Sequence, residues 1–138
     1  MDCLFCKIAR GDLPSFKIHE NDRALAFLDI NPGARGHVLV IPRRHAENFL
    51  DLEAEDRDAV MALAHEVSVQ LMAEDGVEGL NLHQSNGAVA GQVVFHFHLH
   101  LLPRRRGDDL RSPWIPKEAD MAELESMAAR LARACAGA

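Results

Sequence analysis

Short runs of hydrophobic residues, separated by polar and turn-forming residues, occupy most of the first two thirds of the chain. Apolar runs at 16–18 and 24–28 flank Asn21 and Asp22, a pair that favours a turn, and together they predict a β-hairpin. After a loop at 31–33, a β-branched run at 36–42 predicts a buried strand that ends at Pro42. Two more strands are predicted at about 80–84 and 95–102.

Two other segments have helical periodicity. Between 52 and 73 apolar residues recur at steps of three and four, and Asp and Glu crowd the first turn, where they suit the helix dipole; the apolar positions are Val60, Leu63, Ala64, Val67 and Leu71. A C-terminal helix is predicted over about 117–136, with an apolar stripe at Met121, Leu124, Met127, Ala128, Leu131 and Cys135. The stripe predicts that Cys135 is a buried, inert thiol.

Length and composition limit the class of protein. The 138 residues, 48% hydrophobic and 26% charged, fit one domain, 1–138, without a linker. We expect no contact with a membrane, because no apolar run is long enough to span one, and a cytoplasmic location, because the N-terminal residues lack a secretion signal. A net charge of −6 argues against binding nucleic acid but allows a small phosphorylated ligand in a local pocket.

A row of histidines within the run 95–102 is the main candidate for chemistry. His96, His98 and His100 occupy every second position, so a strand would place them on one face. The opposite face would bury the intervening apolar residues, Phe95, Phe97, Leu99 and Leu101. Imidazole can act as a nucleophile, a proton donor or a metal ligand near neutral pH. The row therefore predicts a functional site.

Two other interpretations of the histidine row are open. The histidines could form only the polar face of an amphipathic strand. They could also form a metal centre by themselves, but same-face neighbours on a strand lie roughly 6.5–7 Å apart. Zinc requires donor nitrogens at about 2.0–2.1 Å, a geometry that three residues in line satisfy only with difficulty. We therefore expect the three histidines to be divided between roles.

The histidine row, the stretch 36–45 with its final His45, and the Ala90–Gly91–Gln92 segment together resemble the histidine triad (HIT) superfamily. The resemblance covers about 3–105 and is greatest to the Hint branch, the nucleoside phosphoramidases, in its bacterial zinc-containing subgroup. It implies an α+β HIT-like fold: a five-stranded antiparallel sheet with one long helix, a short N-terminal helix and a C-terminal helix. It also implies a homodimer that hydrolyses conjugates of a purine nucleotide, AMP or GMP.

The resemblance also implies roles for particular residues. His98 would be the nucleophile that forms a nucleotidyl-histidine intermediate, and His100 would contact the phosphate or leaving group and assist proton transfer. The phosphate-side loop would be formed by Asn86, Gly91, Gln92 and Val93. Many relatives have Ser or Thr where this chain has Val93, so the hydroxyl of that position is missing here.

The nucleoside would occupy a hydrophobic site whose residues are Phe5, Ile8, Phe27, Ile30 and Leu39, with Asp29 accepting hydrogen bonds from the ribose hydroxyls. Without the resemblance, these apolar residues are simply candidates for the core. Asp29 stands just before a loop and could equally be a turn former.

The chain has three cysteines, of which Cys3 and Cys6 form a Cys-x-x-Cys pair. Such a pair needs two further ligands to close a structural tetrahedral zinc site, and no strand precedes it as a thioredoxin-like motif would require. The bacterial Hint subgroup implies a zinc site made of Cys3, Cys6, His45 and His96; the alternative is two free thiols. We expect His37 to be structural and assign no role to His19, His65 or His83.

The sequence thus predicts a hydrolase of phosphorus–nitrogen or phosphoanhydride bonds in nucleotides, specifically a purine nucleoside phosphoramidase. One alternative is a Fhit-like dinucleoside polyphosphate hydrolase. Another is a zinc-stabilised nucleotide-binding or scaffold protein whose catalysis is vestigial, an interpretation that the missing hydroxyl at Val93 leaves open.

Overall fold

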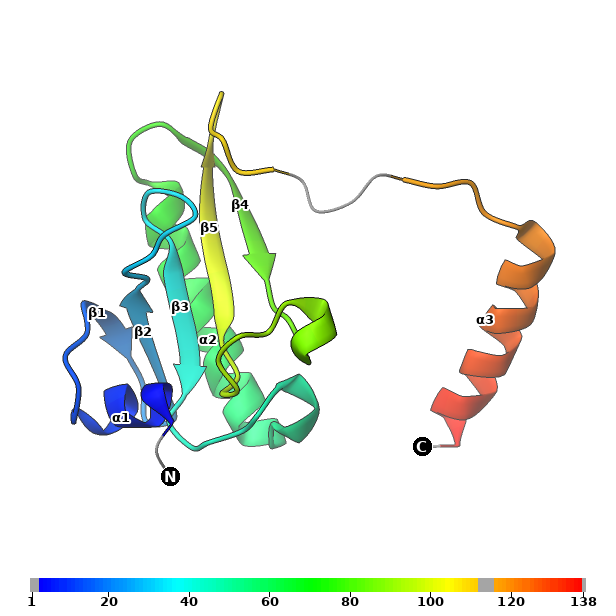
Figure 1. Ribbon diagram of the computed structural model, residues 1–138, viewed down its shortest axis with the longest axis horizontal. Coiled ribbons are helices and arrows are strands. Elements are labelled where there is room, and N and C mark those ends of the chain that lie inside the picture. The colour runs from blue at the N-terminus through cyan, green and yellow to red at the C-terminus, as the bar shows by residue number, and fades with distance from the viewer. Residues whose placement is uncertain (1–2, 112–115, 138) are drawn as a thin grey trace.

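The computed structural model describes residues 3–111 and 116–137. One sheet has the strand order β1-β2-β3-β5-β4, and every neighbouring pair is antiparallel (Figure 1). The strands are β1 (Lys17–Glu20), β2 (Ala24–Leu28), β3 (Val38–Pro42), β4 (Val77–His83) and β5 (Leu99–Arg105). The helices are α1 (Leu4–Arg10), α2 (Ala54–Met72) and α3 (Met121–Ala136), with short 3-10 turns at Phe49–Asp51 and Ala88–Ala90. The implied α+β fold with five antiparallel strands is confirmed.

The long helix α2 covers one face of the sheet and forms the main core. Its buried apolar residues are those of the predicted periodic pattern, Val60, Leu63, Ala64, Val67 and Leu71. They pack against side chains from β2, β3 and β5, including Ala26, Val40 and Leu101. Because each large apolar side chain contributes about 1.5–3 kcal/mol when fully buried, this face holds α2 on the sheet.

The other face of the sheet carries a smaller apolar cluster under α1. Phe5 from α1 packs against Phe27, with ring centroids 5.7 Å apart, and against Leu25, Leu39 and Ile41. The helix is short, but Cys3 caps its start and Gly11, at φ 83°, ends it in a left-handed conformation that suits glycine. This cluster brings the N-terminal residues next to the histidines.

The prediction of one strand carrying all three histidines is wrong in part. β5 begins only at Leu99, so His96 and His98 precede it in irregular backbone, and β3 pairs with β5 no further than Val40 opposite Leu99. The Pro42 carbonyl instead lies 2.9 Å from His96 Nε2, and Phe97 N donates to Ala46 O at 2.7 Å. These contacts, one of them to the last residue of β3, take the place of the regular strand pairing that ends at Leu99. Phe95 is 43% exposed and does not join the core, contrary to expectation.

The prediction that Cys135 is buried is also wrong. Cys135 is exposed, and so are the other described side chains of α3, because the helix stands away from the sheet (Figure 1). The predicted apolar stripe is present on one face of α3, but none of the helix residues is buried. Of the helices in residues 3–111 and 116–137, none is long and apolar enough to cross a membrane.

Candidate functional site

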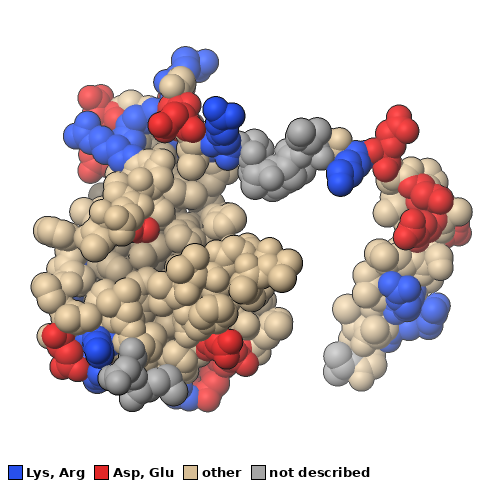
Figure 2. Space-filling view, viewed as in Figure 1, with Lys and Arg blue, Asp and Glu red and all other residues tan. Residues whose placement is uncertain are grey.

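An apolar cavity of about 640 Å³ opens between α1 and the sheet. Nine residues predicted for the site line it: Phe5, Ile8, Phe27, Asp29, Ile30, Leu39, Val93, His98 and His100. Other lining residues come from the segment after α1 and were not predicted, because no motif or periodicity marks them: Leu13, Pro14 and Ser15. Figure 2 shows that the centre of the visible face carries few charged side chains, which gather mainly at its two ends. The arrangement suits a ligand with a large flat apolar part.

His98 presents one ring nitrogen to this cavity. Its Nδ1 lies 2.7 Å from the backbone carbonyl of His96, which can only accept, so we assign the proton to Nδ1. The lone pair is then on Nε2. The Phe5 ring meets the imidazole edge-on, with centroids 5.1 Å apart, and fixes the orientation of the ring. His98 therefore has a nucleophilic nitrogen with a defined direction.

His100 is held by a second histidine. Gly33 N–H donates to His37 Nδ1 at 3.0 Å, so the proton of His37 is on Nε2, which lies 2.8 Å from His100 Nδ1. His100 then accepts at Nδ1 and carries its own proton on Nε2. The rings of His98 and His100 are 4.9 Å apart. His37, for which the sequence indicated only a structural role, thus sets the tautomer of a site residue.

Burial controls the protonation of this pair. Desolvation lowers the pKa of His100 to about 4, with further lowering by the neighbouring His98, His37 and His83, while Asp29 opposes the shift. Burial likewise lowers the pKa of His37, against the opposing charge of Asp29. Both rings are therefore neutral at pH 7, which is the state that their hydrogen bond requires.

Hydrogen bonds between its own side chains and nearby backbone groups hold the predicted phosphate-side loop in shape. Gln92 is buried; its Oε1 accepts from Gly87 N at 2.8 Å, and its Nε2 donates to Glu47 O at 2.6 Å. Asn86 Oδ1 accepts from Phe49 N at 2.8 Å. Gly91 has φ 97°, a conformation that favours glycine. Asn86, Gly91 and Gln92 shape this loop and do not line the cavity.

Val93 and His83 complete the surroundings of the histidines. Val93 is 84% exposed and lines the cavity. His83 pairs across the sheet with His100, ring centroids 5.6 Å apart, and its Nε2 lies 3.2 Å from Ser85 Oγ. Nothing in the sequence pattern distinguished His83 from the other isolated histidines.

Four potential metal ligands converge beside the cavity. Ligand atoms of Cys3, Cys6, His45 and His96 all lie within 4.8 Å of one another. Sulfur to Nδ1 distances are 3.4 Å for Cys3–His96, 3.3 Å for Cys6–His45 and 3.5 Å for Cys6–His96. A tetrahedral zinc site with ordinary bond lengths separates its donors by roughly 3.3–3.8 Å. The donor set therefore fits zinc in both chemistry and spacing.

The environment of His96 also suits a ligand. The side chain is fully buried, and burial lowers its pKa to about 4, so the ring is neutral. Its Nε2–H donates to Pro42 O at 2.9 Å, which leaves the Nδ1 lone pair directed at the two sulfurs. Burial and the neighbouring Cys3 raise the pKa of the Cys6 thiol, and a bound cation would favour the thiolate instead.

An antiparallel α+β domain that sets paired imidazoles on the wall of an apolar cavity defines the histidine triad class of proteins. The chain belongs to the HIT domain family, which matches residues 10–107. Among its relatives, the adenosine 5'-monophosphoramidase hnt1 of Schizosaccharomyces pombe is 41% identical over 104 residues, covering 75% of each chain.

Solved structures agree with this assignment. A crystal structure of a protein from Streptococcus mutans superposes with a TM-score of 0.91 at 37% identity, over 97% of this chain and 85% of that one. A Zn-bound histidine triad family protein from Mycobacterium smegmatis gives a TM-score of 0.75 at 35% identity, over 97% of this chain and 98% of that one.

Proposed function

We propose that the protein is a purine nucleoside phosphoramidase, a nucleotidyl hydrolase that releases a nucleoside monophosphate through a nucleotidyl-histidine intermediate. The observation that carries the proposal is His98: its Nδ1–H is tied to the His96 carbonyl at 2.7 Å, and its Nε2 is free at the cavity wall. Membership of the HIT family and the phosphoramidase name of the yeast relative support a nucleotide hydrolase.

In the first step, His98 Nε2 attacks the α-phosphorus, the new N–P bond forms, and the bond from phosphorus to the leaving amine breaks as the amine takes up a proton from His100 Nε2–H or from solvent. The positive charge that develops on the imidazole is stabilised through Nδ1–H by the His96 carbonyl. In the second step, water attacks phosphorus and gives up a proton, which replaces the one taken by the amine. The N–P bond breaks with its electron pair returning to His98 Nε2, and the monophosphate is released.

His100 contributes through its Nε2–H. That proton is available because His37 Nε2–H occupies His100 Nδ1 at 2.8 Å. We assign His100 the role of hydrogen-bond donor to the phosphoryl group or to the leaving atom, next to the attacking His98. Asn86, Gly91, Gln92 and the Val93 backbone would keep the loop in place around the phosphate.

The apolar cavity would hold the purine nucleoside, with Phe5, Ile8, Phe27, Ile30 and Leu39 against the base and sugar. Asp29 would bind the ribose hydroxyls. Its Oδ1 already accepts from Asn31 N at 2.8 Å, so it forms the turn, and its Oδ2, 3.6 Å from His37 Nε2, would accept from the ligand. Both interpretations of Asp29 made from the sequence are compatible with this geometry.

Zinc at Cys3, Cys6, His45 and His96 would be structural, because the four protein donors fill a tetrahedron and leave no position for water. When bound, the metal would cross-link the N-terminal helix to the segment that carries the nucleophile. We also propose that the chain is a single HIT domain, with a core at about 3–105 and a helical extension, and that it works as a homodimer.

The test is phosphorus NMR of the purified protein, incubated separately with adenosine phosphoramidate and with a diadenosine polyphosphate. We expect AMP to appear rapidly from the phosphoramidate and the His98→Ala variant to be inactive. Preferential cleavage of the dinucleotide would favour the Fhit-like alternative, and silence from both substrates would favour a nucleotide-binding protein without catalysis. Full activity of His98→Ala would contradict the nucleophile assignment.

A further inference from the structure

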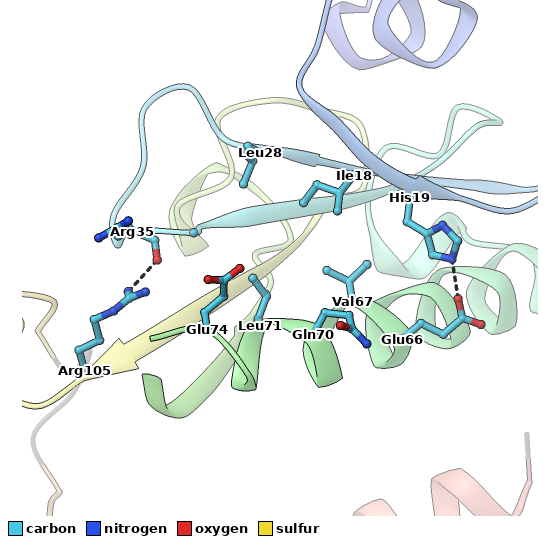
Figure 3. Close-up of a pocket in the computed structure, with 11 residues that line it drawn as sticks. Ile18, His19, Leu28, Arg35, Glu66, Val67, Gln70, Leu71, Glu74 and Arg105 are labelled. Carbon is cyan, nitrogen blue, oxygen red and sulfur yellow. Dashed lines mark hydrogen bonds and ion pairs between the residues drawn. The ribbon is translucent and has the colours of Figure 1, made fainter. Parts of the chain in front are cut away.

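A second cavity, of about 700 Å³, lies between α2 and the outer strands β1 and β2 (Figure 3), and neither His98 nor His100 lines it. Its apolar lining comes from Val67 and Leu71 of α2, Ile18 of β1 and Leu28 of β2. Ile18 and Leu28 are 46% and 38% exposed, so this groove leaves aliphatic surface open to water. We call it the α2–β1 groove. Open apolar surface within a cavity is typical of a docking site.

The two ends of the α2–β1 groove differ in charge. Arg35 and Arg105 stand at one end, where Arg105 donates to the Arg35 carbonyl at 2.9 Å, and Glu74 lies beside them (Figure 3). At the other end Glu66 meets His19 at 3.0 Å. Arg105 also donates to Asp75 O, whereas the Arg35 guanidinium has no partner within the described part of the chain. The groove is therefore net cationic at the Arg35 end and acidic at the Glu66 end.

The helix α3 has a complementary pattern. Its apolar stripe is exposed: Met121 by 75%, Leu124 by 48%, Met127 by 39% and Leu131 by 51%. Acidic residues stand at its start, Asp120, Glu123 and Glu125, and basic ones near its end, Arg130 and Arg133. In proteins, most of the stability of an amphipathic helix such as this one, of 16 residues, comes from packing of its apolar face. The stripe therefore requires a surface to cover it.

No residue of α3 is buried against the described part of its own chain. Figure 1 shows α3 apart from its own domain. The stretch 106–120, between β5 and α3, could span roughly 50 Å if extended, which is enough for α3 to reach a neighbouring molecule. The Streptococcus mutans crystal structure matches 97% of this chain with a TM-score of 0.91. Residues 106–138 are a large share of the 138, so a different position of α3 in that structure would lower the score well below this value. A helix that keeps such a position away from its own domain points to a second chain as the surface beneath it.

We propose that the α2–β1 groove binds α3 of a second copy of this chain, and that two copies exchange these helices symmetrically. The acidic start of α3 lies at Arg35 and Arg105, and its basic end lies at Glu66. The stripe covers the exposed side chains of Ile18 and Leu28, which lie beside the buried Val67 and Leu71. α3 is about 24 Å long, so its central turns fill the groove and its ends reach both charged groups. A symmetric exchange closes a dimer and leaves no unfilled groove.

The native Cys135 near the end of α3 provides a direct test. A disulfide needs Cα atoms within about 7 Å, so the proposed direction places Cys135 near residue 19 and away from residue 35. The His19→Cys and Arg35→Cys variants are oxidised with glutathione disulfide at low protein concentration and run on a non-reducing gel. We expect a covalent dimer from His19→Cys, several-fold more than from Arg35→Cys, that disappears when Cys135→Ala is added.

Other outcomes overturn the proposal. A disulfide-linked monomer would place α3 in the groove of its own chain, and equal dimer yields from the two variants would mean that α3 does not occupy the groove in this direction. Circular dichroism of each variant verifies folding. Because the test uses no nucleotide, its result is independent of the proposed function.

A charge exchange tests the pairing itself. In the His19→Cys background, Arg35→Glu should lower the dimer yield several-fold, and adding Glu123→Arg should restore it. Arg57→Glu, on the exposed start of α2 outside the groove, is the matched control and should leave the yield unchanged. Failure of Glu123→Arg to restore the yield, with Arg35→Glu alone reducing it, would contradict contact between these two groups.

Discussion

His37 Nε2 and His100 Nδ1 are 2.8 Å apart, and this hydrogen bond joins the residue just before β3 to one within β5. Gly33 N–H occupies the other nitrogen of His37, so the pair has one consistent arrangement of protons. The site therefore depends on a histidine outside the row that gives the family its name.

The first prediction concerns this hydrogen bond. Replacing His37 by Ala should lower kcat for adenosine phosphoramidate about 10- to 100-fold with little change in KM, because His100 loses its fixed tautomer while the apolar cavity is retained. Steady-state kinetics measure the effect. His65→Ala, an exposed position on α2, is the control; a His37→Ala kcat within twofold of the parent would refute the role.

The second prediction concerns pH. The pKa of His100 is lowered to about 4 in the folded protein from an ordinary value of 6.5, so the unfolded chain binds more protons between these limits. The free energy of unfolding is therefore highest above pH 6.5 and should fall by up to about 3 kcal/mol towards pH 4. Urea denaturation across this range measures it. His100→Asn should show a shallower dependence, and an unchanged slope would exclude His100 as a source.

The third prediction concerns the metal. The Cys3→Ala variant should lose bound zinc and have a lower melting temperature. The His98→Ala variant should keep its zinc and its melting temperature, because His98, unlike Cys3, is not one of the four donors. Elemental analysis and thermal unfolding, with and without a chelator, measure these effects. Stoichiometric zinc in Cys3→Ala would contradict the assigned ligand set.

The fourth prediction concerns Val93. Since its side chain is 84% exposed at the cavity, Val93→Ser should change stability by less than about 0.5 kcal/mol. The new hydroxyl should raise the rate about tenfold for amines that leave poorly, because these need a proton most, and should have little effect on good leaving groups. A series of phosphoramidates with leaving amines of graded pKa measures the trend. Equal effects across the series would mean that position 93 does not act on the leaving group.

Features set by local periodicity could be predicted from the sequence. The α2 core positions follow from steps of three and four residues, and the hairpin of β1 and β2 follows from Asn21, whose Oδ1 accepts from Arg23 N and Ala24 N. The apolar residues that the family resemblance assigned to the nucleoside site also lie together around one cavity.

Features set by distant contacts could not be predicted in this way. The histidine row leaves the strand because Pro42 O and Ala46 O, distant in sequence, bind His96 and Phe97. The stripe that includes Cys135 specified an apolar helix face but not which surface covers it, because periodicity describes a helix and not its neighbour. The roles of His37 and His83 arise from strand pairing, which brings them to His100.

The donor cluster joins residues that are far apart along the chain: Cys3 and His96 are separated by 93 positions. An ion bound there would close a loop containing most of the domain, and in the chain-entropy description a closed loop of that length is worth about 4–5 kcal/mol. Closure also has a temporal consequence. During synthesis Cys3 and Cys6 leave the ribosome first, and His96 follows only after four of the five strands have been made. The orientation of the nearby nucleophile is therefore established late in synthesis.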